Sequence, residues 1–473
     1  LRTKISENYR SDEKICVDNL LSIVESVSLN KEDVNQLAYN LISKVRETRV
    51  KGDGVDALMQ EFKLSTTEGV ALMCLAESLL RIPDKKTQDQ LISDKICKGD
   101  WHSHIKSGNM FVNAVSWGLL ITNKLVYSQN HNILFNSLKK IIELGAEPLI
   151  RKAMKVAVQF MGNQFVIAED INNAIKISKE KEAKGYQFSY DMLGEAAIDN
   201  EDAQRYIQSY ISAIHIVGVA NSSRGIYNGP GISVKLSAIH PRYQRSQYKR
   251  VMSELYLRLK ELYLLAQKYQ IALFIDAEES ERLEISLDLL EKLANDPDLN
   301  GFNGIGFVIQ AYQKRAIYVI DYIAKLAIKS NKKFMIRLVK GAYWDSEIKK
   351  AQVDGQVDYP VFTRKFYTDL SYIACAKKLF DHSAQIYPAF ATHNALSLVT
   401  IYYMAQNYQT TQYEFQCLYG MGETLYDNVV GENNLGIKCR VYAPVGTHKT
   451  LLSYLVRRLL ENGANSSFVH QIV

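Results

Sequence analysis

The sequence predicts an α/β protein, a TIM-like (βα)8 barrel preceded by an α-helical N-terminal region. Two observations lead to this prediction. From about residue 185, short apolar runs rich in β-branched residues alternate with longer helical stretches, and eight such runs occur. Seven of the eight carry a polar or charged side chain at or near their C-terminal end, which is where barrel enzymes place their chemistry. An open doubly wound sheet is the rival fold, but it usually has fewer strands.

The eight expected strands cover residues 188–196, 231–239, 271–279, 304–312, 334–343, 386–394, 413–421 and 439–446. Helix-like stretches such as 248–269 and 281–294 separate them. The polar side chains near the strand ends are Glu195, Lys235, Asp276, Gln310, Arg337, His393 and Tyr442.

Residues 1–165 are expected to be helical. In the segment 33–49, Leu37, Leu41, Ile42 and Val45 share one face at spacings of three and four. The segment 67–80 is too apolar for a surface helix, so we expect it to be buried. We therefore divide the chain into an N-terminal helical arm (1–65), a helical linker region (66–184) and a barrel (185–473).

Composition narrows the class of protein. With 57 Lys+Arg against 51 Asp+Glu, the net charge of +6 is spread over 473 residues, and no run of five like charges occurs. This balance speaks against a nucleic-acid partner, and we expect none. The hydrophobic content of 47% excludes a mostly disordered chain.

The cysteines and the chain start indicate the compartment. The six cysteines form no CxxC pair and have no His at metal-ligand spacing, so we expect reduced thiols in the cytoplasm and no metal. The polar start is no secretory signal, and the apolar stretch 109–126 is shorter than the ~20 residues of a membrane span. Peripheral membrane contact stays open. The chain begins without Met, which predicts a piece of a longer protein.

Two charged residues stand within or after apolar strands. Lys235 is either a lysine that reaches the surface or a Schiff-base or anion-binding group, because a buried lysine needs a partner. Asp276 is either a helix N-cap or the charge partner of Lys235 on the neighbouring strand. His393 is more often structural than ligating in such a position, and no second His stands at metal-ligand spacing from it.

The segment 337–344 and the last helix carry the clearest chemistry. Arg337 and Lys340 would place positive charge at the barrel mouth, and Gly341 permits close approach of a ligand. Trp344 offers a flat surface for stacking. Together these residues suit a planar cofactor that becomes negatively charged on reduction. The alternative is that the segment is a strand end exposed to solvent.

In the last helix, four residues spaced by three and four share one side, and an arginine pair suits a carboxylate held by two bonds. These residues are Tyr454, Arg457, Arg458 and Glu461. Tyr442 would close over that ligand. The alternative is that the two arginines are exposed and form a salt bridge with Glu461. No GxGxxG follows a strand, so a dinucleotide would bind without a Rossmann domain.

The segments 276–279, 337–344, 442–448 and 454–465 together resemble the proline dehydrogenase family, most closely the proline dehydrogenase domain of bifunctional proline utilization A. The resemblance covers roughly residues 65–467. It implies a distorted (βα)8 barrel with FAD at its C-terminal mouth. It also implies oxidation of L-proline to Δ1-pyrroline-5-carboxylate by hydride transfer from C5 to flavin N5, with electrons passed to a membrane quinone. This is the first step of proline catabolism to glutamate.

The resemblance also implies roles for single residues. Asp276 and Arg337 are expected to be catalytic, with Arg337 near flavin N5. The expected substrate-binding residues are Lys235, Asp276, Leu418, Tyr442, Tyr454, Arg457 and Arg458. The expected FAD-binding residues are Ala277, Gln310, Arg337, Val339, Lys340, Gly341, Ala342, Trp344, Thr363, Arg364, Lys365, Thr392, His393 and Glu461.

Members of that family continue into an aldehyde dehydrogenase domain, which we expect in the full-length protein. They work peripherally at the inner membrane, and longer members carry an N-terminal DNA-binding segment, of which residues 1–30 show no sign. Two rival functions remain: an aldolase-like barrel with Lys235 as Schiff-base nucleophile, and a helical interaction module in residues 1–165.

Overall fold

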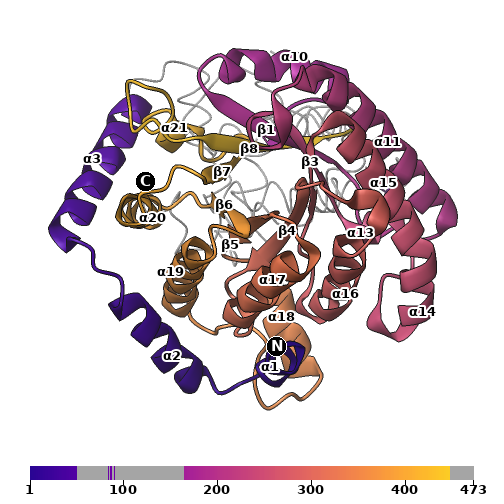
Figure 1. Ribbon diagram of the computed structural model, residues 1–473, viewed down its shortest axis with the longest axis horizontal. Coiled ribbons are helices and arrows are strands. Elements are labelled where there is room, and N and C mark those ends of the chain that lie inside the picture. The colour runs from indigo at the N-terminus through magenta and orange to yellow at the C-terminus, as the bar shows by residue number, and fades with distance from the viewer. Residues whose placement is uncertain (51–83, 85, 88–89, 91–164, 448–473) are drawn as a thin grey trace. The chain divides into compact units, whose positions relative to one another are not determined.

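The computed structural model describes residues 1–50, 84, 86–87, 90 and 165–447 (Figure 1). The chain divides into two compact units, Leu1–Val45 with Val166–Gly446 and Arg46–Phe165 with Thr447–Val473. Most described residues belong to the first unit, whose fold follows. In the second unit, Asp84 accepts a hydrogen bond from the backbone N–H of Thr87 at 2.8 Å. The expected segment 67–80 lies outside the described residues, and the expected boundaries at 65 and 184 stay predictions.

Eight parallel strands close into a barrel in sequence order, as the repeat of strand and helix predicts. The barrel closes where β1 pairs with β8 over seven residue pairs, from Tyr186 with Cys439 to Met192 with Val445. The strands are β1 (Tyr186–Met192), β2 (Gly231–Val234), β3 (Ala272–Ile275), β4 (Ile305–Gln310), β5 (Phe334–Val339), β6 (Ile386–Ala391), β7 (Glu414–Leu418) and β8 (Cys439–Val445). All eight expected strands are confirmed.

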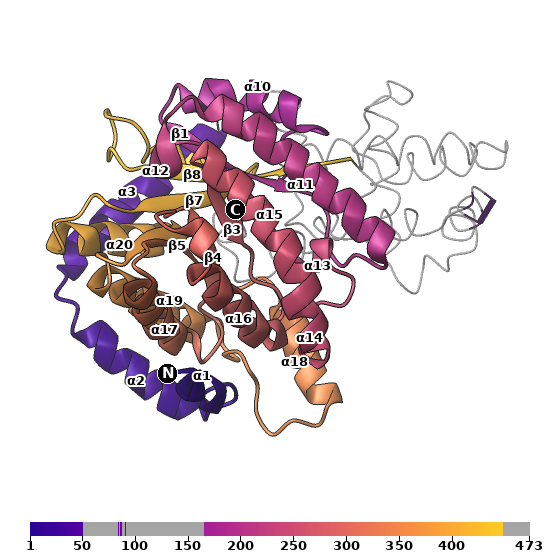
Figure 2. The same cartoon turned by 45° about the vertical axis from the view of Figure 1, so that its right-hand side comes forward.

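Helices surround the barrel (Figure 1). The helices of the barrel region are α10 (Ile171–Glu182), α11 (Asn200–Asn221), α12 (Gly225–Asn228), α13 (Leu236–Ile239), α14 (Tyr248–Arg250), α15 (Tyr256–Tyr269), α16 (Leu283–Ala294), α17 (Ala316–Ser330), α18 (Trp344–Val353), α19 (Lys365–Asp381), α20 (Ala395–Asn407) and α21 (Glu423–Tyr426). Short 3-10 helices are η1 (Arg245–Gln247), η3 (Ser280–Arg282) and η4 (Pro297–Leu299), and η2 (Val251–Leu255) is a π-helix. Figure 2 shows α11 and α15 side by side, and the two helices are in contact. None of the helices in the described part of the chain is long and apolar enough to cross a membrane.

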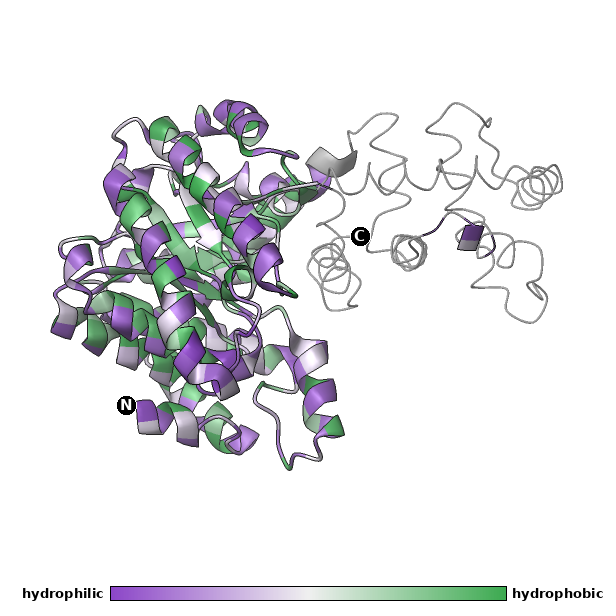
Figure 3. Cartoon of the chain, turned by 90° about the vertical axis from the view of Figure 1, so that its right-hand side faces the viewer, coloured by the Kyte–Doolittle hydropathy of each residue, from purple (hydrophilic) through white to green (hydrophobic). Residues whose placement is uncertain are grey.

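The core lies between the strands and the helix faces that turn toward them. Figure 3 shows apolar residues gathered on the strands, while apolar and polar residues alternate along the helices. On α16, for example, Leu289, Leu290 and Leu293 are fully buried, as the spacing of three and four residues predicts. Inside the barrel, Phe274, Val308 and Met335 belong to one apolar cluster, above which the polar site is built.

The N-terminal arm packs against the helices of the barrel. It consists of α1 (Arg2–Glu7), α2 (Glu13–Glu25) and α3 (Lys31–Val50), and α2 contacts α19 while α1 contacts α17 (Figure 1). The buried residues of α3 include Leu41 and Val45, as expected, whereas Leu37 and Ile42 are only half-buried. The remaining buried positions are Val34 and Ala38, so the buried face is turned slightly from the expected one.

All eight strands end before their expected runs do, and the first two show how the chain turns away from a strand. The first ends at Met192, because the backbone N–H of Ala197 bonds to the oxygen of Ser237 (2.9 Å) instead of continuing the ladder. Ala196 also has a left-handed φ of 49°, which turns the chain. The second expected strand ends at Val234, and Leu236–Ile239 forms α13. Glu278 accepts the backbone N–H of Ser237 in that helix at 3.0 Å.

Candidate active site

Four side chains from four strands meet at the carboxyl ends of β1, β2, β3 and β8. The ammonium of Lys235 donates to Oδ2 of Asp191 at 2.6 Å and to the hydroxyl of Tyr442 at 3.2 Å, and it lies 3.5 Å from Oδ2 of Asp276. The Tyr442 hydroxyl is 2.6 Å from Oδ2 of Asp191 and 2.7 Å from Oδ2 of Asp276. We call these four residues the acid cluster.

The acid cluster does not have enough protons for all its short contacts. A phenol has one proton, so Tyr442 can donate to only one of the two carboxylates at a time. The other carboxylate oxygen then faces the tyrosine oxygen with no proton between them. A further proton taken up on a carboxylate would relieve this contact. The acid cluster can therefore hold or pass a proton.

Burial and neighbouring charges act on the titration of the cluster. Burial, together with the nearby Asp276, raises the pKa of Asp191 despite the opposing effect of Lys235. Burial alone would lower the pKa of Lys235, but the carboxylate of Asp191, with Tyr442 and Asp276, raises it well above its usual value. Burial and the two carboxylates also raise the pKa of Tyr442 well above its usual value. Lys235 is therefore charged and Tyr442 is neutral.

Arg337 on β5 joins the acid cluster through Asp276. Its NH1 donates to Oδ1 of Asp276 at 2.8 Å, its NH2 to Ser233 at 2.9 Å and its Nε to Gln416 at 2.6 Å. The two cations, Lys235 and Arg337, balance the two carboxylates, Asp191 and Asp276, so the formal charge of the group is zero.

These contacts decide between the alternatives left open for two residues. Lys235 is 7% exposed, so it does not reach the surface as a solvated lysine would. Asp276 binds Arg337 and Tyr442 and does not act as a helix N-cap. A Schiff-base lysine needs a neutral amine, and a raised pKa disfavours that form of Lys235.

The residues expected to bind a flavin line the neighbouring strand ends. Gln310 on β4 donates to the backbone oxygen of Glu278 at 2.8 Å and accepts the N–H of Ala342 at 3.2 Å, which ties the loop after β5 to β3 and β4. Burial lowers the pKa of Lys340, although its ion pair with Asp369 opposes this. Trp344 donates to the oxygen of Phe362 at 2.9 Å and remains 41% exposed.

Other expected flavin residues are held by protein partners. Thr363 donates from its N–H and its hydroxyl to the two carboxylate oxygens of Glu13 in the arm, at 2.6 and 2.7 Å. His393 accepts the N–H of Leu418 through Nε2 at 3.0 Å, and this bond places Leu418 at the end of β7. Thr392 is buried beside it. Arg364 and Lys365 are exposed at the start of α19.

The donor set fits a flavin. From Arg337 to Ala342 the chain passes from buried to exposed, so a guanidinium, an ammonium and backbone N–H groups follow one another at the open end of the barrel. Gly341 has a φ of 140°, and a Cβ at this position would overlap the ring of Tyr312. Cations and N–H donors can stabilise a planar ring that gains electrons, and an exposed indole can stack against it.

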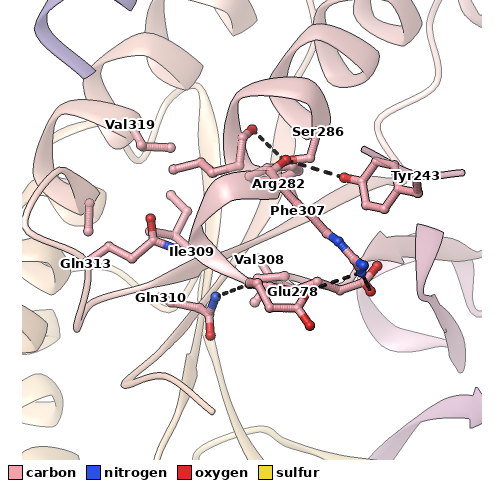
Figure 4. A pocket seen from close by; sticks show the side chains of 14 residues that line it. Tyr243, Glu278, Arg282, Ser286, Phe307, Val308, Ile309, Gln310, Gln313 and Val319 are labelled. Atoms are coloured by element: carbon pink, nitrogen blue, oxygen red, sulfur yellow. Dashed lines mark hydrogen bonds and ion pairs between the residues drawn. The ribbon is translucent and has the colours of Figure 1, made fainter. Parts of the chain in front are cut away.

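A pocket lies beside these residues, between the ends of β3 and β4 and helix α16 (Figure 4). Ala277, Glu278, Gln310 and Arg282 line part of it. Figure 4 shows Gln310 pointing toward the backbone at Glu278. Burial raises the pKa of Glu278, although its ion pair with Arg282 (2.6 Å) opposes this. Two of the residues that line the pocket, Ala277 and Gln310, are expected flavin residues.

Four expected residues lie outside the described residues: Tyr454, Arg457, Arg458 and Glu461. Their roles stay predictions. The sequence interpretation also missed Asp191 and Gln416, which touch Lys235 and Arg337. Each had the same signal as Lys235, a polar residue inside an apolar strand. Glu195, which was singled out on the first strand instead, lies beyond the end of β1.

The chain forms a closed parallel (βα)8 barrel with a buried acid–base cluster at the carboxyl ends of its strands. This arrangement is typical of barrel enzymes. The family model described as proline dehydrogenase matches residues 174–471. The chain belongs to the proline dehydrogenase family, which confirms the resemblance. Residues 1–46 match a model described as the proline utilization A proline dehydrogenase N-terminal domain, and residues 54–165 match one described as the DNA-binding domain of proline dehydrogenase.

Relatives extend this result. The chain is 58% identical over 479 residues to the bifunctional protein PutA of Klebsiella aerogenes, covering 100% of this chain and 36% of that protein. It is 29% identical over 325 residues to proline dehydrogenase 1 of Bacillus subtilis, covering 68% of this chain and 93% of that one. A crystal structure of Bradyrhizobium japonicum proline utilization A superposes with a TM-score of 0.73 at 42% identity, covering 98% of this chain and 46% of that chain. The chain thus spans about a third of the length of its curated PutA relative.

Proposed function

We propose that this chain oxidises L-proline to Δ1-pyrroline-5-carboxylate with FAD as its cofactor. The observation that carries the proposal is the joining of Arg337 to the acid cluster through Asp276, at the barrel end where the expected flavin residues gather. FAD, when bound, supplies the acceptor for the hydride that leaves proline C5. Gln310, Lys340, Ala342 and Trp344 would hold it, with the remaining residues expected from the resemblance.

Arg337 and the acid cluster have separate tasks. The fixed positive charge of Arg337 stabilises negative charge that develops on the acceptor side during the reaction. Loss of hydride from C5 needs the lone pair of the ring nitrogen, so the substrate must first lose a proton from its ammonium group. Asp191 and Asp276 are the carboxylates that can hold this proton, and Tyr442 can pass it between them.

Substrate recognition needs cations beyond those in the barrel. Lys235 and Arg337 are already balanced by Asp191 and Asp276, so the group has no net positive charge left for a carboxylate. We therefore keep Arg457 and Arg458 as the proposed clamp on the proline carboxylate, with Lys235 beside it. Tyr442, Tyr454 and Leu418 would pack against the ring.

The wider setting follows from the relatives. We propose that electrons pass to a membrane quinone, that the protein works in the cytoplasm and peripherally at the inner membrane, and that an aldehyde dehydrogenase domain continues the full-length protein. DNA binding by residues 54–165 is a second candidate function, favoured by the description of the matching family model. That description disagrees with the expectation that this chain has no nucleic-acid partner. None of the described residues tests that expectation.

Purified protein supplied with FAD, L-proline and a soluble quinone analogue tests the first proposal. We expect the imine product, trapped by an aromatic amine, to form in proportion to the quinone consumed. No product with a flavin-loaded protein would refute the activity. Borohydride trapping of substrate on Lys235 would instead support the aldolase-like alternative. Fluorescence anisotropy with labelled duplex DNA at physiological salt tests the second function, which an unchanged anisotropy would refute.

A further inference from the structure

A chain of four buried polar side chains runs from Arg337 across the barrel interior to β8. Oε1 of Gln416 accepts a hydrogen bond from Nε of Arg337 at 2.6 Å, and Nε2 of Gln416 donates to Oε1 of Glu414 at 2.7 Å. Glu414 then accepts two bonds from Arg440, Nε to Oε1 at 2.7 Å and NH2 to Oε2 at 2.8 Å. The exposed fraction of each side chain is 4% or less.

The two neighbours of Gln416 fix the orientation of its amide. If the amide were flipped, its NH2 group would face the N–H of Arg337, and its carbonyl oxygen would face the carboxylate of Glu414. Both contacts would be repulsive, and burial strengthens such a repulsion. Glu414 and Arg337 therefore both require that the oxygen of Gln416 faces Arg337.

Arg440 fixes Glu414 in turn. Besides its ion pair with Glu414, Arg440 donates to the backbone oxygens of Gly229 at 2.7 Å and Tyr227 at 3.2 Å. It also donates to Oε1 of Gln187 at 2.9 Å. The pair is therefore tied to the backbone of the segment before β2, and Glu414 has one position from which to orient Gln416.

We propose that Gln416 is a positioning residue for the reaction, acting through Arg337; this inference rests on the proposed function. An arginine carries five N–H groups, and among the described residues Gln416, Asp276 and Ser233 engage three of those on Arg337. Asp276 and Ser233 hold only the two terminal nitrogens. The bond from Nε to Gln416 adds the third anchor, so that all three nitrogens of the planar guanidinium are held and the direction of its other two N–H groups is set.

Gln416→Met tests this role, because methionine has about the length of glutamine and forms no strong hydrogen bond. We expect the variant to retain FAD and a KM for proline within about twofold of the wild type. The rate of anaerobic flavin reduction should fall about tenfold, the change that the loss of one charge-assisted hydrogen bond produces. The reduction potential of the bound flavin should become more negative, because Arg337 no longer stabilises the reduced form.

Two further variants separate positioning from packing. In Gln416→Glu, a protonated side chain would donate to Glu414 and accept from Arg337 as glutamine does, so we expect the rate and potential to return toward wild type. Cys417→Ala removes a buried side chain from the same strand and should lower the melting temperature while leaving the flavin potential unchanged. A wild-type potential and rate in Gln416→Met would overturn the proposal. So would equal losses in Gln416→Met and Gln416→Glu. If instead the wild-type flavin is not reduced by proline, the proposed function itself fails.

Discussion

The ammonium nitrogen of Lys235 lies 2.6 Å from Oδ2 of Asp191, and both side chains are buried. Lys235 comes from the end of β2 and Asp191 from the neighbouring β1, so the pairing of the two strands brings the charges together. A buried charge left without its partner is costly, whereas a complete pair is only weakly stabilising. The pair therefore places a fixed, charged lysine inside the barrel.

Asp191→Asn should destabilise the protein by about 3–5 kcal/mol, because it leaves Lys235 buried without its closest carboxylate. Chemical denaturation of the purified protein measures this loss. The double variant Asp191→Asn with Lys235→Met removes both charges and should recover part of the stability. If the double variant loses the sum of the two single effects, the two residues are not coupled.

The same substitution should change the pH dependence of stability. The raised pKa of Lys235 means that its stabilising contribution is present below its usual value of 10.5 and is lost only as pH rises through the higher folded value. Asp191 is the largest of the influences that raise the pKa of Lys235, so without it this pKa falls below its wild-type value. Unfolding measured between neutral and alkaline pH should then show the Lys235-dependent change at lower pH than in the wild type. Identical pH profiles of stability in the wild type and the variant would show that Asp191 does not keep Lys235 charged.

Arg457→Met and Arg458→Met test the carboxylate clamp. Each should retain the flavin absorbance but lose saturation with proline, because the guanidinium forks bind the substrate carboxylate already in the ground state. Effects on kcat should arise from lost alignment of C5. Lysine at either position should give an intermediate KM, since it lacks the planar fork. A wild-type KM in either Met variant would exclude the clamp.

Glu13→Ala should loosen the loop before α19, because Thr363 loses the acceptors of both its N–H and its hydroxyl. We expect hydrogen exchange at the Thr363 amide to rise about tenfold, corresponding to one lost charge-assisted bond. FAD should also dissociate faster if Thr363 contributes to its site. Asp18→Ala, on the exposed side of the same helix, is the matched control. Equal exchange in both variants would show that the arm does not hold this loop.

Gly341→Ala should cost about 1–3 kcal/mol, because alanine rarely adopts a φ of 140° and its Cβ would overlap Tyr312. Thermal unfolding of the variant with and without FAD measures the effect. Combining it with Tyr312→Ala should give a loss smaller than the sum, because the overlap is then absent while the strain in φ remains. Strict additivity would place Gly341 away from Tyr312.

The sequence predicted the barrel because eight apolar runs alternate with helices, and in a parallel barrel their polar ends must converge. Lys235, Asp276, Arg337 and Tyr442 were found in this way. Asp191 was missed because the strands of a barrel are staggered. The side chain that β1 contributes to the site therefore comes from its next-to-last residue, Asp191, and not from the end of the apolar run.

The contact of Glu13 with Thr363 joins residues 350 positions apart, and no local pattern reports such a contact. Gln416 was missed for a different reason. Its role depends on which groups face the two ends of its amide, and these come from β5 and from its own strand neighbour Glu414. The packing of the closed barrel decides both.

In the proposed reaction, Arg337 and the acid cluster serve the oxidation of proline by a flavin. Anaerobic titration of the FAD-loaded protein with L-proline, followed through the visible absorbance of the flavin, tests it most directly. We expect proline to bleach the flavin fully, and we expect Arg337→Met, still loaded with FAD, to be bleached far more slowly. A flavin that keeps its colour in excess proline, or a protein that binds no flavin, would contradict it.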